Sequence, residues 1–226
     1  MSLNTRSNQQ EWDILAKRLG ECYTGAVYDV MHELGLTDSV LPPEIRALNP
    51  ETRVSGRVFT MQGKPHPNID AHESLIRWTE FLAAAPGGHV VVCQPEDHSR
   101  AIMGELSAEA LHLRGVRGYI VDGGCRDNAF IQKLGFPVFA RFQTPRDILG
   151  EWAVETVGET IEIGHVQIRT GDFVLADIDG IVIVPEKSAE LIISQVEKVM
   201  ATENLVRKAI RNGMSPADAY RTYGKF

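Results

Sequence analysis

The chain has 226 residues, of which 30 are acidic and 23 are lysine or arginine, and its formal net charge is −7. This length allows one substantial hydrophobic core and favours one domain over two. The sequence has no basic run, so a nucleic-acid surface with clustered lysine and arginine is not expected. No apolar stretch approaches the roughly 18 residues of a membrane span, so a membrane is not expected as a partner either.

Cysteine usage and the N-terminal sequence bear on the cellular compartment. The cysteines are odd in number, far apart and without a C-x-x-C pair, at Cys22, Cys93 and Cys125. This pattern disfavours a disulfide framework and a structural zinc site, and it favours a reducing, cytoplasmic location. The first residues are polar and lack the apolar segment of a signal peptide. Residues 1–10 are therefore expected to form a disordered arm ahead of a single domain over 11–226.

Helical and strand patterns alternate from the N-terminus to residue 142. Two helices are expected over 11–20 and 24–35, the second with Thr24 as its cap and Gly35 at its end. The patterns that follow are strand 53–62, helix 71–88 with Pro86-Gly87-Gly88 as its stop, strand 89–94, helix 105–115, strand 118–123, helix 127–135 and strand 137–142. Strands and helices that alternate with short links indicate parallel βαβ units.

The last third of the chain has a different pattern. Short strands separated by turn residues are expected over 159–164, 166–177 and 180–187, with a hairpin signal at Asp179-Gly180. A long amphipathic helix over 187–212 then ends at Gly213. Its apolar residues would be exposed on a helix that leaves the domain, so we expect it to pack on a neighbouring subunit. The expected class is α/β, with a βαβαβ core, β-hairpins and a long C-terminal helix.

Two loops are expected at the carboxyl edge of the parallel strands, where such sheets bind ligands. One follows strand 89–94 and enters a helix through Gly104, Glu105, Leu106 and Ser107. Free backbone amides at a helix start attract a carboxylate or phosphate, and Gly104 allows close approach. The other loop is "GGCRD", residues 123–127. Its Arg126 offers a planar fork for a carboxylate or enolate oxygen, and Asp127 is a hard oxygen ligand suited to Mg²⁺ or Mn²⁺.

Together these groups could hold a small 2-oxo acid, but a purely structural interpretation stays open. Asp127 could be the N-cap of the next helix, with Arg126 in a surface ion pair. The two glycines could serve an ordinary turn. Cys125 has no histidine or acid nearby in the sequence and is expected to be a bystander. No lysine lies in either loop, so a Schiff base has no candidate.

Histidines offer two further candidates. His66, Asp70 and His72 lack the partners at defined spacing that strong zinc sites have, so a loop and helix start is favoured there. His98 lies at the same strand edge as the two loops and is a candidate for the rim of the site.

The segment "GELSAEALHLRGVRGYIVDGGCRD", followed by "GFPVFAR", resembles the RraA-like family, which includes the class II 4-hydroxy-4-methyl-2-oxoglutarate (HMG) aldolases. The family motif is a G-[DE]-L loop with Arg-Asp further along the chain, and both parts are present. The similarity extends to "TGDFVLADIDGIVIVP" and covers nearly the whole chain from about residue 20. The resemblance implies a swivelling β/β/α fold, trimers or hexamers, and active sites at subunit interfaces.

The resemblance also implies roles for individual residues. Gly104 to Ser107 and Arg126 would bind substrate, and Asp127 would ligate a divalent metal cation whose other ligands are waters. Glu105, where some aldolases have aspartate, would hold a water or handle a proton. Glu203 would reach the site of a neighbouring subunit and hold a metal-bound water.

The activity implied by the resemblance is metal-dependent cleavage of 4-hydroxy-2-oxo diacids to pyruvate, with oxaloacetate decarboxylation as a side activity. A second possibility from another class is a non-catalytic regulator that binds and inhibits ribonuclease E. Such regulators are shorter and lack the aspartate after the arginine. Asp127 and the long C-terminal helix therefore favour the enzyme.

Overall fold

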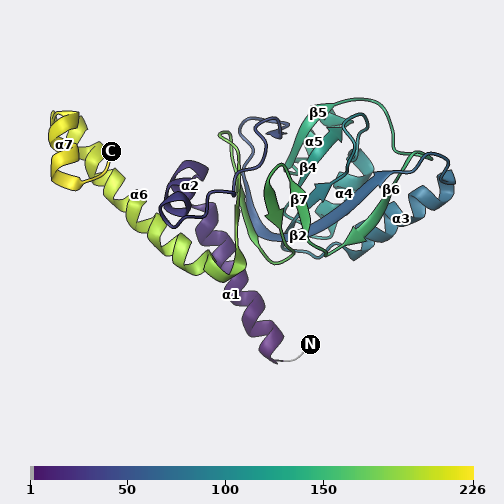
Figure 1. Cartoon of the computed structure of the whole chain (residues 1–226), viewed down its shortest axis with the longest axis horizontal. Coiled ribbons are helices and arrows are strands. Elements are labelled where there is room, and N and C mark those ends of the chain that lie inside the picture. Colours follow the sequence, from purple (N-terminus) through teal and green to yellow (C-terminus); the bar gives the residue numbers. More distant parts are fainter. Residues whose placement is uncertain (1–2) are drawn as a thin grey trace.

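The computed structural model describes residues 3–226, with side chains from residue 10 onward, and has a mixed α/β fold around one curled sheet (Figure 1). The helices are α1 (Leu3–Gly20), α2 (Thr24–Glu33), α3 (Ala71–Ala84), α4 (Glu105–Leu113), α5 (Asn128–Leu134), α6 (Ala189–Arg211) and α7 (Pro216–Tyr223). The strands are β1 (Arg46–Ala47), β2 (Val54–Pro65), β3 (His89–Gln94), β4 (Gly118–Cys125), β5 (Val138–Gln143), β6 (Trp152–Val157), β7 (Ile161–Ile163), β8 (Val166–Ile168), β9 (Phe173–Ala176) and β10 (Ile181–Val184).

The sheet has the order β1-β5-β4-β3-β2-β9-β10, and its central pairs β2–β3, β3–β4 and β4–β5 are parallel. Helices α3, α4 and α5 connect these strands, so the expected parallel βαβ units are confirmed. The long strand β2 pairs antiparallel with β9 near its start and with β6 near its end. These two partners curl the sheet around β2, which puts the C-terminal hairpins beside the parallel core.

Three apolar clusters hold the layers together. One lies between the sheet and α3, α4 and α5, and includes Trp78, Leu111 and Ile131. A second fills the opposite face of the sheet. The third packs α1, α2 and the first half of α6 against β9 and β10. Because the first cluster lies under the helices that follow β3 and β4, it fixes where the starts of those helices lie.

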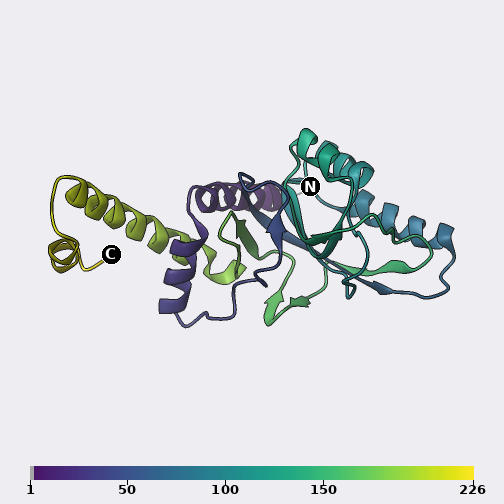
Figure 2. The same ribbon diagram turned by 90° about the horizontal axis from the view of Figure 1, so that it is seen from above.

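Helix α6 differs in part from the expectation for residues 187–212. Its first half is core, since Ile192, Ile193 and Val196 are fully buried. Its second half leaves the body and carries α7, which the sequence did not predict, at its far end (Figures 1 and 2). The second half of α6, called its free half below because it extends beyond the core, gives the molecule its elongated shape (Figure 1).

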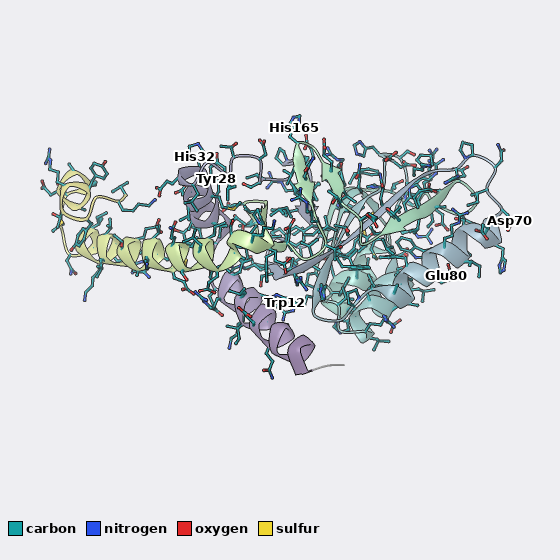
Figure 3. All side chains as sticks on the ribbon, turned by 60° about the horizontal axis from the view of Figure 1, so that its bottom comes forward. Trp12, Tyr28, His32, Asp70, Glu80 and His165 are labelled. Carbon is teal, nitrogen blue, oxygen red and sulfur yellow. The ribbon has the colours of Figure 1, made fainter. Side chains whose placement is uncertain are left out.

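The start of the chain differs from the expectation. Residues 3–10 are helical rather than a disordered arm, because α1 begins at Leu3; residues 1 and 2 lie outside the described residues. Further along α1, the Arg57 guanidinium stacks over the ring of Trp12, 3.5 Å from its centre (Trp12 is labelled in Figure 3).

Thr24 does not cap its own helix α2. The Asp177 carboxylate caps it instead, accepting hydrogen bonds from the Thr24 backbone amide at 2.9 Å and from its hydroxyl at 2.7 Å. Asp177 is distant in sequence, so local spacing could not have identified this cap.

Candidate active site

The loop after β3 lies directly alongside the end of β4. Ile102 N–H donates to the Gly124 carbonyl at 2.8 Å, Gly124 N–H donates to the Arg100 carbonyl at 3.1 Å, and Arg126 N–H donates to the Met103 carbonyl at 2.9 Å. The two loops predicted to meet at the carboxyl edge of the sheet are thus hydrogen-bonded to each other. The start of α4 is held against Arg126 and Asp127 by this backbone pairing.

The paired glycines of "GGCRD" are required by this close approach and not by a turn. Strand β4 runs through both of them to Cys125. A Cβ atom on Gly124 would lie 2.5 Å from the Arg100 carbonyl oxygen and 2.7 Å from a ring carbon of Phe142. A Cβ atom on Gly123 would lie 2.9 Å from Pro95. Any larger residue would push the α4 loop away from the strand.

Asp127 does not cap the helix that follows it. Its backbone is left-handed, with φ of 57°, and its side chain makes no cap hydrogen bond to α5. Instead its Oδ2 atom accepts from the backbone amide of Glu105, at the start of α4, at 3.2 Å. Left-handed backbone at a non-glycine residue costs free energy and is concentrated at functional sites. Asp127 thus occupies the N-cap position of α5, but the interpretation of its side chain as the cap is wrong, and the carboxylate lies at the junction of the two loops.

Arg126 lies between two carboxylates. Its Nε atom is 3.5 Å from Asp127 Oδ2, and its Nη1 atom is 3.2 Å from Asp147 Oδ2. Asp147 comes from the segment after β5, where the Ala101 amide donates to the Arg146 carbonyl at 2.9 Å. The sequence analysis missed Asp147, because no motif or periodicity ties it to the Arg-Asp pair.

A cavity of about 520 Å³ opens at this junction. The residues predicted to bind substrate or metal within one chain all line it: Gly104, Glu105, Leu106, Ser107, Arg126 and Asp127. Helix α3 forms the far wall, and its Trp78 donates an indole hydrogen bond to the Ser107 hydroxyl at 2.9 Å. This wall was also not predicted, because the apolar pattern of α3 indicates only that one of its faces is buried.

The cavity provides several kinds of group for an acidic ligand and a cation. The amides of Leu106 and Ser107 belong to the first turn of α4 and have no acceptor within the helix. Within the described part of the chain, Asp127 Oδ1 has no hydrogen-bond or ion-pair partner, since both contacts of this carboxylate are made by Oδ2. An unpaired carboxylate oxygen on a residue that lines the cavity fits a hard divalent cation that keeps most of its water ligands.

Gly104 leaves little room for a side chain, which gives a first prediction. A Cβ atom there would lie 2.9 Å from Asp127 Oδ2 and 3.2 Å from Arg126 Nε, although the backbone itself allows alanine. Gly104→Ala should displace one of these side chains, and a displacement of about 1 Å can cost on the order of 10² in rate. Gly25→Ala is the control, because its new Cβ would meet only Tyr23 ring carbons at 3.6 Å. Equal catalytic rates for the two variants would contradict the close packing.

Other candidate residues lie outside the cavity. Cys125 is buried, and burial raises the pKa of its thiol to about 12, which agrees with a bystander. His98 lies 3.5 Å from Asp122 and does not line the cavity. His66 pairs with Glu155 at 2.5 Å, and Asp70 caps α3. From residue 3 onward, no group of three or more His, Cys, Asp or Glu side chains is placed to hold a metal ion.

Glu203 is not brought to this cavity within one chain. It lies on α6, where it accepts a hydrogen bond from the Tyr23 hydroxyl. The free half of α6 and the cavity-lining helix α3 are at opposite ends of the molecule (Figures 1 and 2). A role for Glu203 in the site would therefore require a second subunit.

Comparison with known proteins defines the class. Residues 24–183 match the RraA-like family model, described as Aldolase/RraA, and the chain belongs to this family. A protein of Halalkalibacterium halodurans named provisionally as an HMG aldolase is 28% identical, over 82% of this chain and 84% of its own. The HMG aldolase of Thermus thermophilus is 26% identical, over 65% of this chain and 84% of its own.

Among solved structures, Streptomyces coelicolor RraAS2 is similar over most of its length. It is described as an unusual member of the RNase ES inhibitor RraA family. It superimposes with a TM-score of 0.76 at 26% identity, over 85% of this chain and 95% of its own. Among the described helices, none has the length and apolar character to cross a membrane. The fold and the family expected from the sequence are thus confirmed, and the family contains proteins named for two different activities.

Proposed function

We propose that the protein is a divalent-metal-dependent carbon–carbon lyase that cleaves 4-hydroxy-2-oxo acids and releases pyruvate, with oxaloacetate decarboxylation as a side activity. HMG is the reference substrate, because similar proteins are named for it. The observation that carries the proposal is the convergence of Arg126, Asp127 and the start of α4 on one cavity. These groups match the carboxylate and 2-oxo oxygens of such a substrate.

Each residue has a role in binding and proton transfer. Arg126 and the free amides of α4 bind the substrate carboxylate and its 2-oxo oxygen. Asp127 would hold a Mg²⁺ or Mn²⁺ ion, which would supply Lewis-acid polarisation of the 2-oxo group. Glu105, or a water that it holds, accepts the proton of the 4-hydroxyl group. The C3–C4 bond then breaks, its electron pair passes to the pyruvate enolate, and Arg126 stabilises the negative charge on oxygen before C3 is protonated.

Removal of the metal tests this proposal directly. Excess EDTA should abolish pyruvate release from HMG and oxaloacetate, and added Mg²⁺ or Mn²⁺ should restore it, as followed by lactate-dehydrogenase coupling. Borohydride with pyruvate should leave no covalent adduct, because neither loop contains a lysine for a Schiff base. Full activity in excess chelator would rule out the metal-dependent mechanism.

The proposal includes a homo-oligomer, trimer or hexamer, in which the free half of α6 and α7 pack on a neighbour. This arm exposes large apolar side chains, at Leu205, Tyr220 and Phe226. Removing residues 213–226 should reduce sedimentation to that of a smaller species while the core stays folded. A deletion from Lys187 would be a poorer test, because it also removes buried Ile192 and Val196. A fully active monomer of the intact chain would contradict the assembly.

Binding to a ribonuclease is the second candidate function, favoured by the likeness to RraAS2. A regulator of this kind should inhibit ribonuclease E in Mg²⁺-containing buffer, in which the nuclease itself is active. It should also retain inhibition after Asp127→Asn, since a protein-binding surface does not depend on one carboxylate in a cavity. Absence of inhibition together with pyruvate release would exclude the regulator and leave the lyase as the remaining candidate function.

A further inference from the structure

The charges in the cavity restrict what else the substrate can carry. Four ionisable side chains line it. Three are acidic, Glu105, Asp127 and Asp147, and the fourth is the cation Arg126. Arg126 is already paired with both Asp127 and Asp147. The 1-carboxylate of a 2-oxo acid can use Arg126 and the start of α4. A second carboxylate would find no further cation among the lining residues, and a charge without a partner is costly to remove from water.

Other residues of the lining are apolar. Leu75, Trp78 and Leu82 of α3 line the cavity together with Ile148. Trp78, Leu82 and Ile148 are each less than a tenth exposed, so their side chains are held by packing. The nearest basic residue on α3, Arg77, is engaged by Glu73 at 2.8 Å and does not line the cavity.

Trp78 is the member of this apolar wall that further contacts hold in place. The Trp78 indole is held by the Ser107 hydroxyl and packs edge-on against Trp152, with ring centres 6.1 Å apart. The cavity of about 520 Å³ lies within the roughly 300–1,000 Å³ typical of small-molecule sites, which is more than a three-carbon acid fills. A rigid apolar wall beside a small polar site is the arrangement that binds a ligand with one acidic end and one apolar end.

We propose that the natural substrate is a 4-hydroxy-2-oxo monoacid whose C4 carries an alkyl or aryl group, and that this group lies against Leu75, Trp78, Leu82 and Ile148. The inference rests on the proposed lyase function and narrows its substrate class. Cleavage of such a substrate yields pyruvate and an apolar aldehyde or ketone, with no second carboxylate in either product half. The pyruvate half keeps Arg126, Asp127 and the α4 amides as its partners.

The first test compares substrates on the wild-type protein with Mg²⁺. Pyruvate release is measured for HMG, for 4-hydroxy-2-oxo acids with methyl, isobutyl and phenyl groups at C4, and for oxaloacetate. We expect kcat/KM for the isobutyl and phenyl substrates to exceed that for HMG by at least about tenfold, the scale of discrimination by one or two apolar groups. A preference for HMG, with activity on oxaloacetate, would overturn the inference and leave the lyase intact. No pyruvate from any substrate would reject the lyase and the inference with it.

Binding gives a readout that does not depend on turnover. By calorimetry, 4-methyl-2-oxopentanoate should bind more tightly than 2-oxoglutarate, which has a second carboxylate in place of the branched end. Thr79→Arg adds a cation to the cavity wall and should shift both binding and kcat/KM toward the diacid. Ala84→Arg adds the same charge to an exposed position of α3 outside the cavity and should leave the preference unchanged. Tighter binding of 2-oxoglutarate by the wild type would overturn the inference.

Discussion

Arg126→Lys is expected to lower kcat for pyruvate release by on the order of 10²–10³, the usual cost of losing one preorganised donor to a developing negative charge. Lysine keeps the positive charge but loses the planar pair of donors that matches a carboxylate or enolate. The enolate oxygen carries more charge than the ground-state ketone, so the loss should fall on kcat more than on KM. Steady-state kinetics with oxaloacetate and HMG measure this split.

The stability of the Arg126→Lys variant should change little. The ion pairs of Arg126 with Asp127 and Asp147 involve side chains that are about 36–44% exposed, and exposed pairs contribute at most about 1 kcal/mol. Arg77→Lys is a matched control, because Arg77 forms an exposed ion pair with Glu73 outside the cavity. Its kcat should equal that of the wild type. A normal kcat for Arg126→Lys would show that this guanidinium does not touch the reacting atoms.

The sequence predicted the parallel core well because its signals there are local. Apolar periodicity and the stops at Pro86 and Gly135 define helices and strands without knowledge of their partners. Several of the elements that were missed depend on long-range contacts. Strand β6 is defined by its pairing with β2, and the two-residue β1 by its pairing with β5. Helix α1 begins at Leu3 in a stretch whose polar composition resembles a disordered arm.

The features of the candidate site also divide into those that the sequence predicts and those that depend on tertiary structure. Motif residues in the loops after two adjacent strands, such as Gly104 and Arg126, could be placed together because parallel strands end at one edge. Asp127 was also placed there, but its left-handed backbone and its hydrogen bond to the Glu105 amide could not be predicted, because they have no signal in the sequence. Asp147 and the α3 wall reach the cavity only through tertiary packing, and these are the residues on which the proposed substrate preference rests.

Asp127→Asn should raise the Mg²⁺ or Mn²⁺ concentration needed for half-maximal activity by at least ~100-fold, since even indirect partners of a metal ligand cost 10–100-fold in affinity. The substitution removes the negative charge of the side chain and keeps its size. Asparagine tolerates the left-handed backbone of residue 127, and its side-chain oxygen can still accept from the Glu105 amide. The melting temperature without metal should therefore stay close to that of the wild type, while the added stability from bound metal should be lost.

Asp147→Asn provides the contrast that makes this result specific. It also removes one carboxylate from the same cavity, but the Asp147 side chain pairs with Arg126 and is not proposed to hold the cation. Its metal requirement should match that of the wild type, so a shift in both variants would indicate a general effect of cavity charge. If Asp127→Asn turns over normally at wild-type metal concentrations, the carboxylate only joins the two loops and the cation binds elsewhere. The paired titrations assign the metal to Asp127 only if the Asp127 variant alone shifts.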